Sequence, residues 1–222
     1  MSSRPHFFFG QGYLVVPPSL NRTMNDAITL TGHTVRLIPL SMDHLDAFCA
    51  VGLHPSVWEH NAWPIRDRNG MEAYIQTALD NRAAGHQLPF ATTLKETGEV
   101  IGSTRFAAID RANRRMEIGW TWITPAWQRT AVNTEAKLLM LRHAFGEAKC
   151  RRVEWKTDAL NQRSRNAILR LGAQFEGTLR AHMIREDGTW RDTVYFSLLD
   201  DEWPTAAAHL EARLAAYGHP TT

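Results

Sequence analysis

In several segments of the chain, apolar and polar residues largely alternate. This pattern is expected for β-strands with one buried face. Two pairs of these segments are separated by short turn signals, KETGE and EDG, so each pair is expected to form a hairpin. The predicted strands are residues 34–40, 89–94, 100–107, 115–123, 152–158, 175–184 and 190–199.

Other segments repeat their apolar residues at helical spacing. The clearest is 134–148, in which the polar residues, Lys137 among them, are assigned to a face opposite the apolar stripe. Asn161 is expected to cap a short helix that Gly172 ends. The remaining predicted helices are 43–51 with Ser41 as N-cap, 69–84 closed by Gly85, and a C-terminal helix over 205–217.

The order of these elements, β α α β β β α β α β β α, mixes antiparallel hairpins with strand–helix units. That mixture predicts the α+β class, built around one mixed sheet. Residues 24–222 are expected to form a single domain, because no linker or repeat divides them. Residues 1–23 are interpreted as an N-terminal extension, since a more ordinary start follows at Met24.

Composition places the chain among ordinary globular proteins, with 44% hydrophobic and 22% charged residues and a formal net charge of +2. This small charge gives no reason to expect nucleic acid or a membrane surface as partner. The apolar run 7–16 is short, contains glycines and lacks a cleavage site, so a cytoplasmic location is predicted. The histidines and the two cysteines lack ligand spacing, so no metal is expected.

The strand 115–123 leads through the turn 128–133 into the helical segment, and Asn133 is a suitable N-cap. Amides at a helix start are unpaired and the helix dipole adds positive charge, a geometry that can hold a phosphate or pyrophosphate. Many strand–helix turns have this pattern and bind nothing. The pattern alone therefore leaves a phosphate site and an ordinary turn both open.

Residues 128–133, Q-R-T-A-V-N, resemble the acyl-CoA motif of the GNAT superfamily, Gln/Arg-x-x-Gly-x-Gly/Ala. The first position matches and both glycines are replaced. EIGW at 117–120 and the pattern N-x-x-S…L-G over 161–172 are similar to neighbouring family segments. Residues 176–198 resemble the end of the ribosomal-protein alanine N-acetyltransferase type.

The resemblance implies a GNAT fold, a mostly antiparallel twisted sheet flanked by helices, and transfer of an acetyl group from acetyl-CoA to an amine in a ternary complex. The acceptor is a protein N-terminus, an amino acid or a small amine, no metal takes part, and family members often form homodimers. Two neighbouring parallel strands, 115–124 and 151–158, are expected to diverge around the pantetheine arm. The residues implied to bind acetyl-CoA are Ile123, Thr124, Gln128, Arg129, Thr130, Ala131, Val132, Asn133, Thr134, Asn161, Ser164 and Arg165.

A base is required because a protonated amine is not a nucleophile, and Glu117 is the first candidate. Several family members place a catalytic glutamate on this strand. The other interpretation is a structural carboxylate at a sheet edge, or one paired with Arg105 or Arg115. Strand alternation puts Glu117, Gly119 and Thr121 on one face, and Met116, Ile118, Trp120 and Trp122 on the other.

Two further residues are candidates for handling the departing thiolate. Ser164 lies one turn into the helix capped by Asn161, and the resemblance implies a hydrogen bond to the thiolate; the alternative is an ordinary first-turn serine. Tyr195 is a candidate general acid, and its alternative is a cross-strand packing residue. For the whole chain, the replaced glycines keep open a non-catalytic protein that binds CoA or a small ligand.

Overall fold

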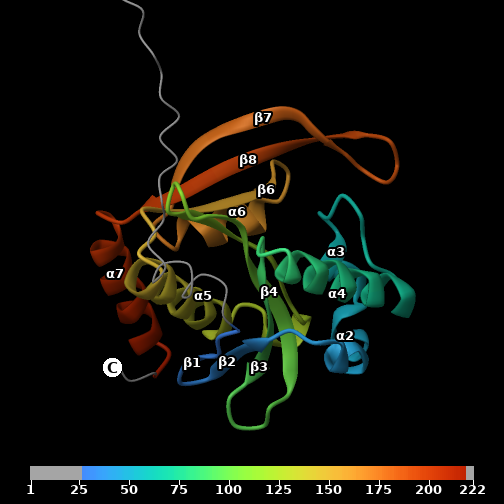
Figure 1. The fold of residues 1–222 in the computed structure, drawn as a ribbon, viewed down its shortest axis with the longest axis horizontal. Coiled ribbons are helices and arrows are strands. Elements are labelled where there is room, and N and C mark those ends of the chain that lie inside the picture. The colour runs from blue at the N-terminus through green and yellow to red at the C-terminus, as the bar shows by residue number, and fades with distance from the viewer. Residues whose placement is uncertain (1–26, 219–222) are drawn as a thin grey trace, which may run out of the picture.

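A computed structural model of the chain describes residues 27–218. The expected extension, residues 1–23, lies outside the described residues. The described strands form one eight-stranded sheet in the order β1-β2-β3-β4-β5-β6-β8-β7, shown in Figure 1. Neighbours are antiparallel except β5 and β6, which are parallel. The strands are β1 Leu30–Thr31, β2 Val35–Pro39, β3 Leu88–Leu94, β4 Val100–Asp110, β5 Arg115–Ile123, β6 Arg152–Asp158, β7 Gln174–Ile184 and β8 Trp190–Leu199.

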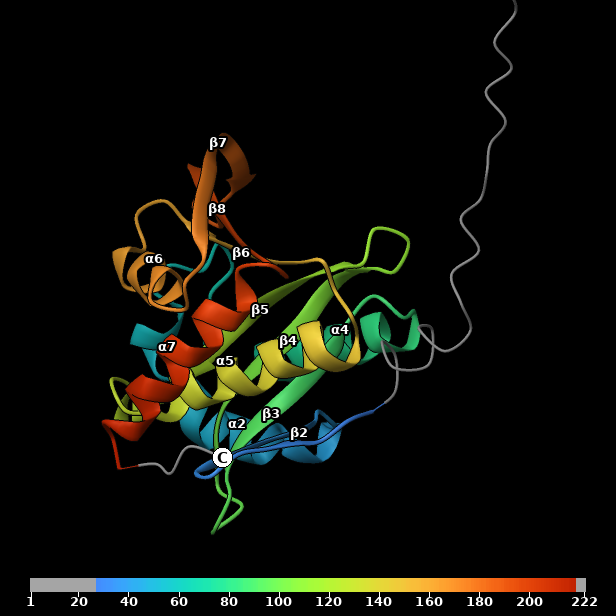
Figure 2. The ribbon, with the colours of Figure 1, turned by 90° about the vertical axis from the view of Figure 1, so that its left-hand side faces the viewer.

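Helices cover both faces of the sheet, so the expected α+β architecture is confirmed. Figure 2 shows α5 and α7 lying side by side on one face, with α2 and α4 on the other. The helices are α2 Leu45–Gly52, α3 Pro55–Trp58, α4 Arg68–Ala83, α5 Val132–Arg142, α6 Gln162–Leu169 and α7 Trp203–Ala215. Three short turns are also helical: η1 Met42–His44, η2 Pro125–Trp127 and η3 His143–Glu147, the last of π type.

Each face of the sheet has its own buried core. On the α5 face, Met116 and Ile118 of β5 pack with Leu141 of α5. On the α2–α4 face, Trp122 of β5 meets the edge of Phe48, with ring centroids 5.1 Å apart. Residues of β5 therefore contribute to both cores, which ties the two helical layers to one strand.

The predicted sharing of one face by Met116, Ile118, Trp120 and Trp122 is wrong. The β4–β5 register shifts where Trp120 and Thr121 lie opposite Thr104, and Trp120 has a φ of 49°. This is a β-bulge, which inserts one extra residue and reverses the alternation beyond it. Trp122 consequently packs on the α2–α4 face, and Thr121 turns toward α5.

The predicted strands and both hairpins are confirmed, with ends shifted by a few residues. The sequence pattern missed β1 and α3 because each spans only about one period of its repeat. Ser41 precedes the turn η1 rather than α2 itself. Gly172 ends the α6 segment with a φ of 91°, a conformation that a residue with a Cβ rarely adopts.

The start of α5 differs from the prediction. Asn133 is not the N-cap: the helix begins at Val132, and the N-cap position is occupied by Ala131. Lys137, assigned by its pattern to the polar face, is 4% exposed. Between residues 27 and 218, no helix has both the length and the apolar character that crossing a membrane requires.

Candidate active site

The parallel strands β5 and β6 are paired only at their first residues. Arg115, Met116 and Glu117 face residues 152–154, and beyond this point no pairing joins the two strands. β6 continues to Asp158 while remaining paired with β8. The expected divergence of the two strands is therefore present, and it leaves a gap in the hydrogen bonding of the sheet beside β5.

The first turn of α5 lies where β5 ends. The amide of Glu135 bonds to the carbonyl of Ala131 at 2.9 Å, so the amides of the three residues before it precede the helical ladder. Of these, the amide of Val132 donates to Thr130 Oγ1 at 3.3 Å. The side-chain oxygen of Asn133 is buried and has no hydrogen-bond partner among the described residues. This turn can accept an anionic group at its amides and a donor at Asn133.

The replaced motif glycines do not disturb this turn. Ala131 has φ −65° and ψ −22°, which any residue adopts, and Asn133 lies within the helix. The unusual angle of the loop falls at Arg129, with a φ of 62°. An alanine and an asparagine therefore fit the two positions without backbone strain.

Gln128 connects this turn to its surroundings. Its Nε2 donates to the carbonyl of Ile123 at 2.8 Å, and its Oε1 accepts from Arg163 Nη1 at 3.3 Å. The same guanidinium donates to the carbonyl of Ser56 at 3.3 Å. One motif residue thus joins the end of β5 to α6 and α3.

The predicted N-cap of α6 is confirmed, because the Asn161 side chain accepts from the amide of Ser164 at 2.9 Å. The hydroxyl of Ser164 makes no hydrogen bond within the described chain, so it is available to a ligand. Arg165, predicted to contact acetyl-CoA, donates one hydrogen bond to the carbonyl of Ala159 at 3.1 Å, and its contact with the cofactor stays a prediction.

Glu117 lies at the point where the two strands part. Its carboxylate is 6% exposed and pairs with Lys156 Nζ of β6 at 2.9 Å. It rests over Gly119, where a Cβ would lie 2.8 Å from its Oε1. Burial raises the pKa of this carboxyl group above its ordinary value, and Lys156 acts in the opposite direction.

Neither arginine proposed as a partner pairs with Glu117. Arg115 instead bridges Asp110 and Glu154. Arg105 is buried, and its guanidinium lies 4.2 Å from the centre of the Tyr74 ring.

Lys156 connects several groups on this face. Its Nζ lies 5.6 Å from the centre of the Trp120 ring, and its backbone is paired with Tyr195 of β8. Tyr195 in turn meets His182 with ring centroids 6.1 Å apart. The two candidates Glu117 and Tyr195 are therefore connected through Lys156.

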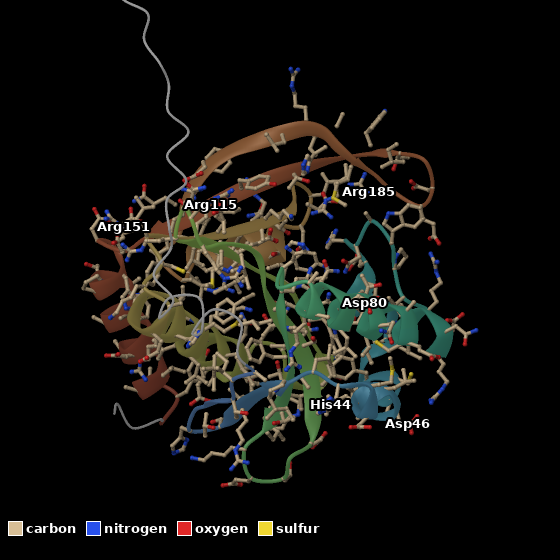
Figure 3. The ribbon with its side chains drawn as sticks, viewed as in Figure 1. His44, Asp46, Asp80, Arg115, Arg151 and Arg185 are labelled. Atoms are coloured by element: carbon tan, nitrogen blue, oxygen red, sulfur yellow. The ribbon has the colours of Figure 1, made fainter. Side chains whose placement is uncertain are left out.

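The β7–β8 hairpin reaches over the α3–α4 side of the molecule, as Figure 1 shows. Near its tip, Glu186 Oε1 accepts from Arg66 Nη1 at 2.8 Å, and its amide bonds to the carbonyl of Ala62 at 3.0 Å. Arg185, labelled in Figure 3, pairs with the buried Asp158 at the end of β6, at 2.6 Å. We call the Arg66–Glu186 contact the clasp.

Sequence reasoning did not identify Lys156, Lys137 or the clasp. The alternation of segment 152–158 could have identified Lys156, because it shares a face with Arg152 and Glu154. The clasp joins residues 120 positions apart, which no local pattern reports. Within residues 27–218, no group of three or more histidine, cysteine or acidic side chains has an arrangement that could hold a metal ion.

Known proteins agree with this architecture. The acetyltransferase (GNAT) domain family matches residues 34–174. An N-acetyltransferase named p20 from Bacillus licheniformis, itself uncharacterised, is 30% identical over 176 residues, which are 79% of this chain and 98% of p20.

Solved structures give the same result. A GCN5-related N-acetyltransferase from Brucella melitensis is 32% identical with a TM-score of 0.76, over 84% of this chain and 85% of that one. RimJ of Mycobacterium smegmatis, solved with CoA-disulfide, is 25% identical with a TM-score of 0.68, over 83% and 90%. With a family match over more than half of its length, this chain belongs to the GNAT acetyltransferase family, whose members use acetyl-CoA.

Proposed function

We propose that this protein transfers the acetyl group of acetyl-CoA to a primary amine by direct attack of the amine on the thioester. The observation that carries the proposal is the gap between β5 and β6. A helix start whose first amides can accept an anion lies at one end of it, and the buried carboxylate of Glu117 lies at the other. The helix start suits the pyrophosphate of acetyl-CoA, and the Glu117 carboxylate is suited to take a proton from the amine.

The chemical step needs one proton to leave the amine and one to reach sulfur. Glu117 takes the amine proton as the nitrogen bonds to the carbonyl carbon, and the carbon–sulfur bond breaks. The raised pKa of its carboxyl group brings it closer to that of an amine, which suits a general base. The Lys156 amino group, 2.9 Å from this carboxylate, favours its ionised form before the attack, against the larger effect of burial.

The hydrogen-bond donor to the departing thiolate is assigned to Ser164 or Tyr195. The Ser164 hydroxyl sits in the first turn of α6 without a protein partner in the described chain. Tyr195 lies on β8 beside Lys156. Either O–H can donate to sulfur, and the two are distinguished by comparing turnover of Ser164→Ala and Tyr195→Phe.

The acceptor we favour is a protein N-terminus. An α-amine has a pKa of about 7.7–8.0 against about 10.4 for lysine, so a single carboxylate suffices to deprotonate it. A related protein of Bacillus subtilis, 32% identical over 48% of this chain and 57% of its own length, is named as a ribosomal N-acetyltransferase. We expect such a chain end to approach Glu117 past the clasp, where the hairpin tip meets the segment between α3 and α4.

The alternative is a non-catalytic protein that binds CoA or a small ligand. It drew its support from the two replaced glycines, and the ordinary backbone angles of Ala131 weaken that argument. The cytoplasmic location and the homodimer stay predictions.

The test is a thermal melt followed by an amine screen. At a hundredfold excess over its dissociation constant, acetyl-CoA should stabilise the protein by about 2.7 kcal/mol. Thiol release is then measured with peptides bearing free or blocked N-termini, amino acids and small amines. Binding without thiol release for any amine contradicts transferase activity, and release with small amines alone contradicts the peptide acceptor.

A further inference from the structure

A buried lysine lies directly beneath the gap, on the face of β5 opposite Glu117. Lys137 of α5 is 4% exposed, and its Nζ donates to Thr121 Oγ1 at 2.6 Å and to Thr104 Oγ1 at 2.7 Å. Its remaining near neighbour is the sulfur of Met140, at 3.9 Å. Within residues 27–218, no carboxylate lies within ion-pair distance of it.

Such a group is costly to bury, and the cost suggests a function. Burial alone lowers the pKa of the Lys137 ammonium from 10.5 to about 7. A leucine or methionine would pack here without that cost. Two hydroxyl groups compensate for only part of the lost hydration.

The two hydroxyl groups differ in what they face. Thr104 is buried at 1% exposure, whereas Thr121 is exposed. Thr121 directly follows the bulge residue Trp120, on the part of β5 that has no pairing with β6. Of the two partners of Lys137, only Thr121 can therefore touch a ligand in the gap.

The Lys137 amino group controls where the Thr121 hydroxyl hydrogen points, because as ammonium or as amine it has an N–H for each of the two hydroxyl oxygens. A hydroxyl oxygen has two lone pairs and one hydrogen. With Lys137 donating to both oxygens, and the oxygens 2.9 Å apart, lone pairs are used within the cluster. When Thr104 is the donor between the two hydroxyl groups, the Thr121 hydrogen has one further acceptor in the described chain, the carbonyl of Gly119 at 3.4 Å, and a ligand oxygen in the gap can replace this long contact.

We propose that Thr121 donates a hydrogen bond to the thioester carbonyl oxygen and that Lys137 is the positioning residue that holds it in this state. The inference rests on the proposed function, because it concerns the acyl group of acetyl-CoA. During attack, negative charge grows on that oxygen. A donor fixed in advance by a buried amino group stabilises this charge without rearrangement.

Other charges around Lys137 are directed elsewhere. On α5, the Glu135 carboxylate accepts amides of residues 34 and 35 at 2.9 Å, and Arg142 pairs with Glu211 of α7 at 2.9 Å. On the strands beneath it, Arg105 of β4 and Glu117 of β5 lie on the opposite face. Arg36 of β2 is exposed.

The test compares three single variants and one double variant. Lys137→Met and Thr121→Val are each expected to lower kcat about tenfold, and together to lower it no further, because one acts through the other. Thr104→Val is the matched control: it removes the other hydroxyl bonded to Nζ and is expected to change kcat less than about threefold. Losses that multiply in the double variant, or a Thr104→Val effect equal to that of Thr121→Val, would overturn the proposal.

A binding measurement separates this inference from the proposed function. Wild-type protein is expected to bind acetyl-CoA more tightly than CoA, and Thr121→Val and Lys137→Met to reduce that preference while binding CoA itself unchanged. Thr121 is exposed, so its variant should keep the fold even if Lys137→Met does not. If the wild type binds acetyl-CoA but acetylates no amine, only the proposed function fails. Equal preference in wild type and Thr121→Val would refute the carbonyl contact.

Discussion

A lysine lies beside the gap on each face of β5. The two lysine amino groups have different kinds of partner. On the α4 face, Lys156 pairs with Glu117 at 2.9 Å and its side chain keeps 31% exposure. On the α5 face, Lys137 is enclosed, and within residues 27–218 its hydrogen-bond partners are two hydroxyl groups and a sulfur. An ion pair that reaches solvent suits proton transfer, because water can hydrate the remaining charge when one partner is neutralised. A buried amino group that donates to two hydroxyl groups suits fixed positioning.

The largest effect is expected on the α4 face. Glu117→Gln keeps the shape of the side chain but removes the base, so kcat should fall at least about tenfold. The stabilisation by acetyl-CoA in a thermal melt should stay as in wild type. Glu154→Gln is the matched control, because Glu154 is the β6 residue paired with Glu117 in register and its carboxylate is bound by Arg115. Unchanged turnover in Glu117→Gln would remove it from the role of base.

The second effect concerns stability on the α5 face. Burial lowers the pKa of Lys137 to about 7 in the folded protein, whereas an unfolded lysine titrates near 10.4. Between these values the unfolded chain binds more protons, so stability should rise as pH increases from 7 toward 10. This group should contribute ~2 kcal/mol between pH 7 and 9.

Urea unfolding of wild type and Lys137→Met at these two pH values measures that contribution. The variant should lack the increase, and Lys95→Met, at an exposed position, should retain it. A wild-type stability that is flat between pH 7 and 9 would show that Lys137 is not held in its amine form, and the contrast between the two faces would be lost.

A third measurement tests the pairing on the α4 face. Lys156 lowers the pKa of the Glu117 carboxyl group, against the larger effect of burial. Lys156→Met should therefore raise that pKa further. Because the base must be ionised, the acid limb of the kcat/KM profile should move to higher pH. Lys156→Arg should leave the limb close to its wild-type position, and an unmoved limb in Lys156→Met would separate the lysine from the base.

Local sequence pattern was enough to predict the sheet and most helices. The hairpins at KETGE and EDG, the Asn161 cap and the strand 115–123 all depend on a few neighbouring residues, and all are present. Pattern failed where a single residue changed the periodicity. Alternation assumes regular pleating and placed Thr121 on the face of Glu117. The bulge at Trp120 instead moves Thr121 to the α5 face.

Lys137 shows a second limit of the sequence. A polar residue in an amphipathic pattern is assigned to solvent, because patterns contain no information on what another element places above it. Here Thr104 and Thr121, from two strands, supply the polar partners that make burial tolerable. The identity of Glu117 as a candidate was available from resemblance, but its partner Lys156 depends on the pairing of β5 with β6.

The smallest effect is expected from removing the clasp, the Arg66–Glu186 contact on the α4 face. Arg66 and Glu186 are both largely exposed, so Arg66→Gln should leave the stability close to that of wild type. Because the clasp holds the hairpin tip against the α3–α4 segment, its loss should change the acceptor KM by a few fold and leave acetyl-CoA binding unchanged. Arg68→Gln is the matched control, since Arg68 makes an exposed ion pair with Asp46 of α2, far from the labelled Arg185 in Figure 3. Equal KM values in the two variants would show that the hairpin tip does not shape the acceptor side, and acceptor selection would then rest on Glu117 and its immediate neighbours.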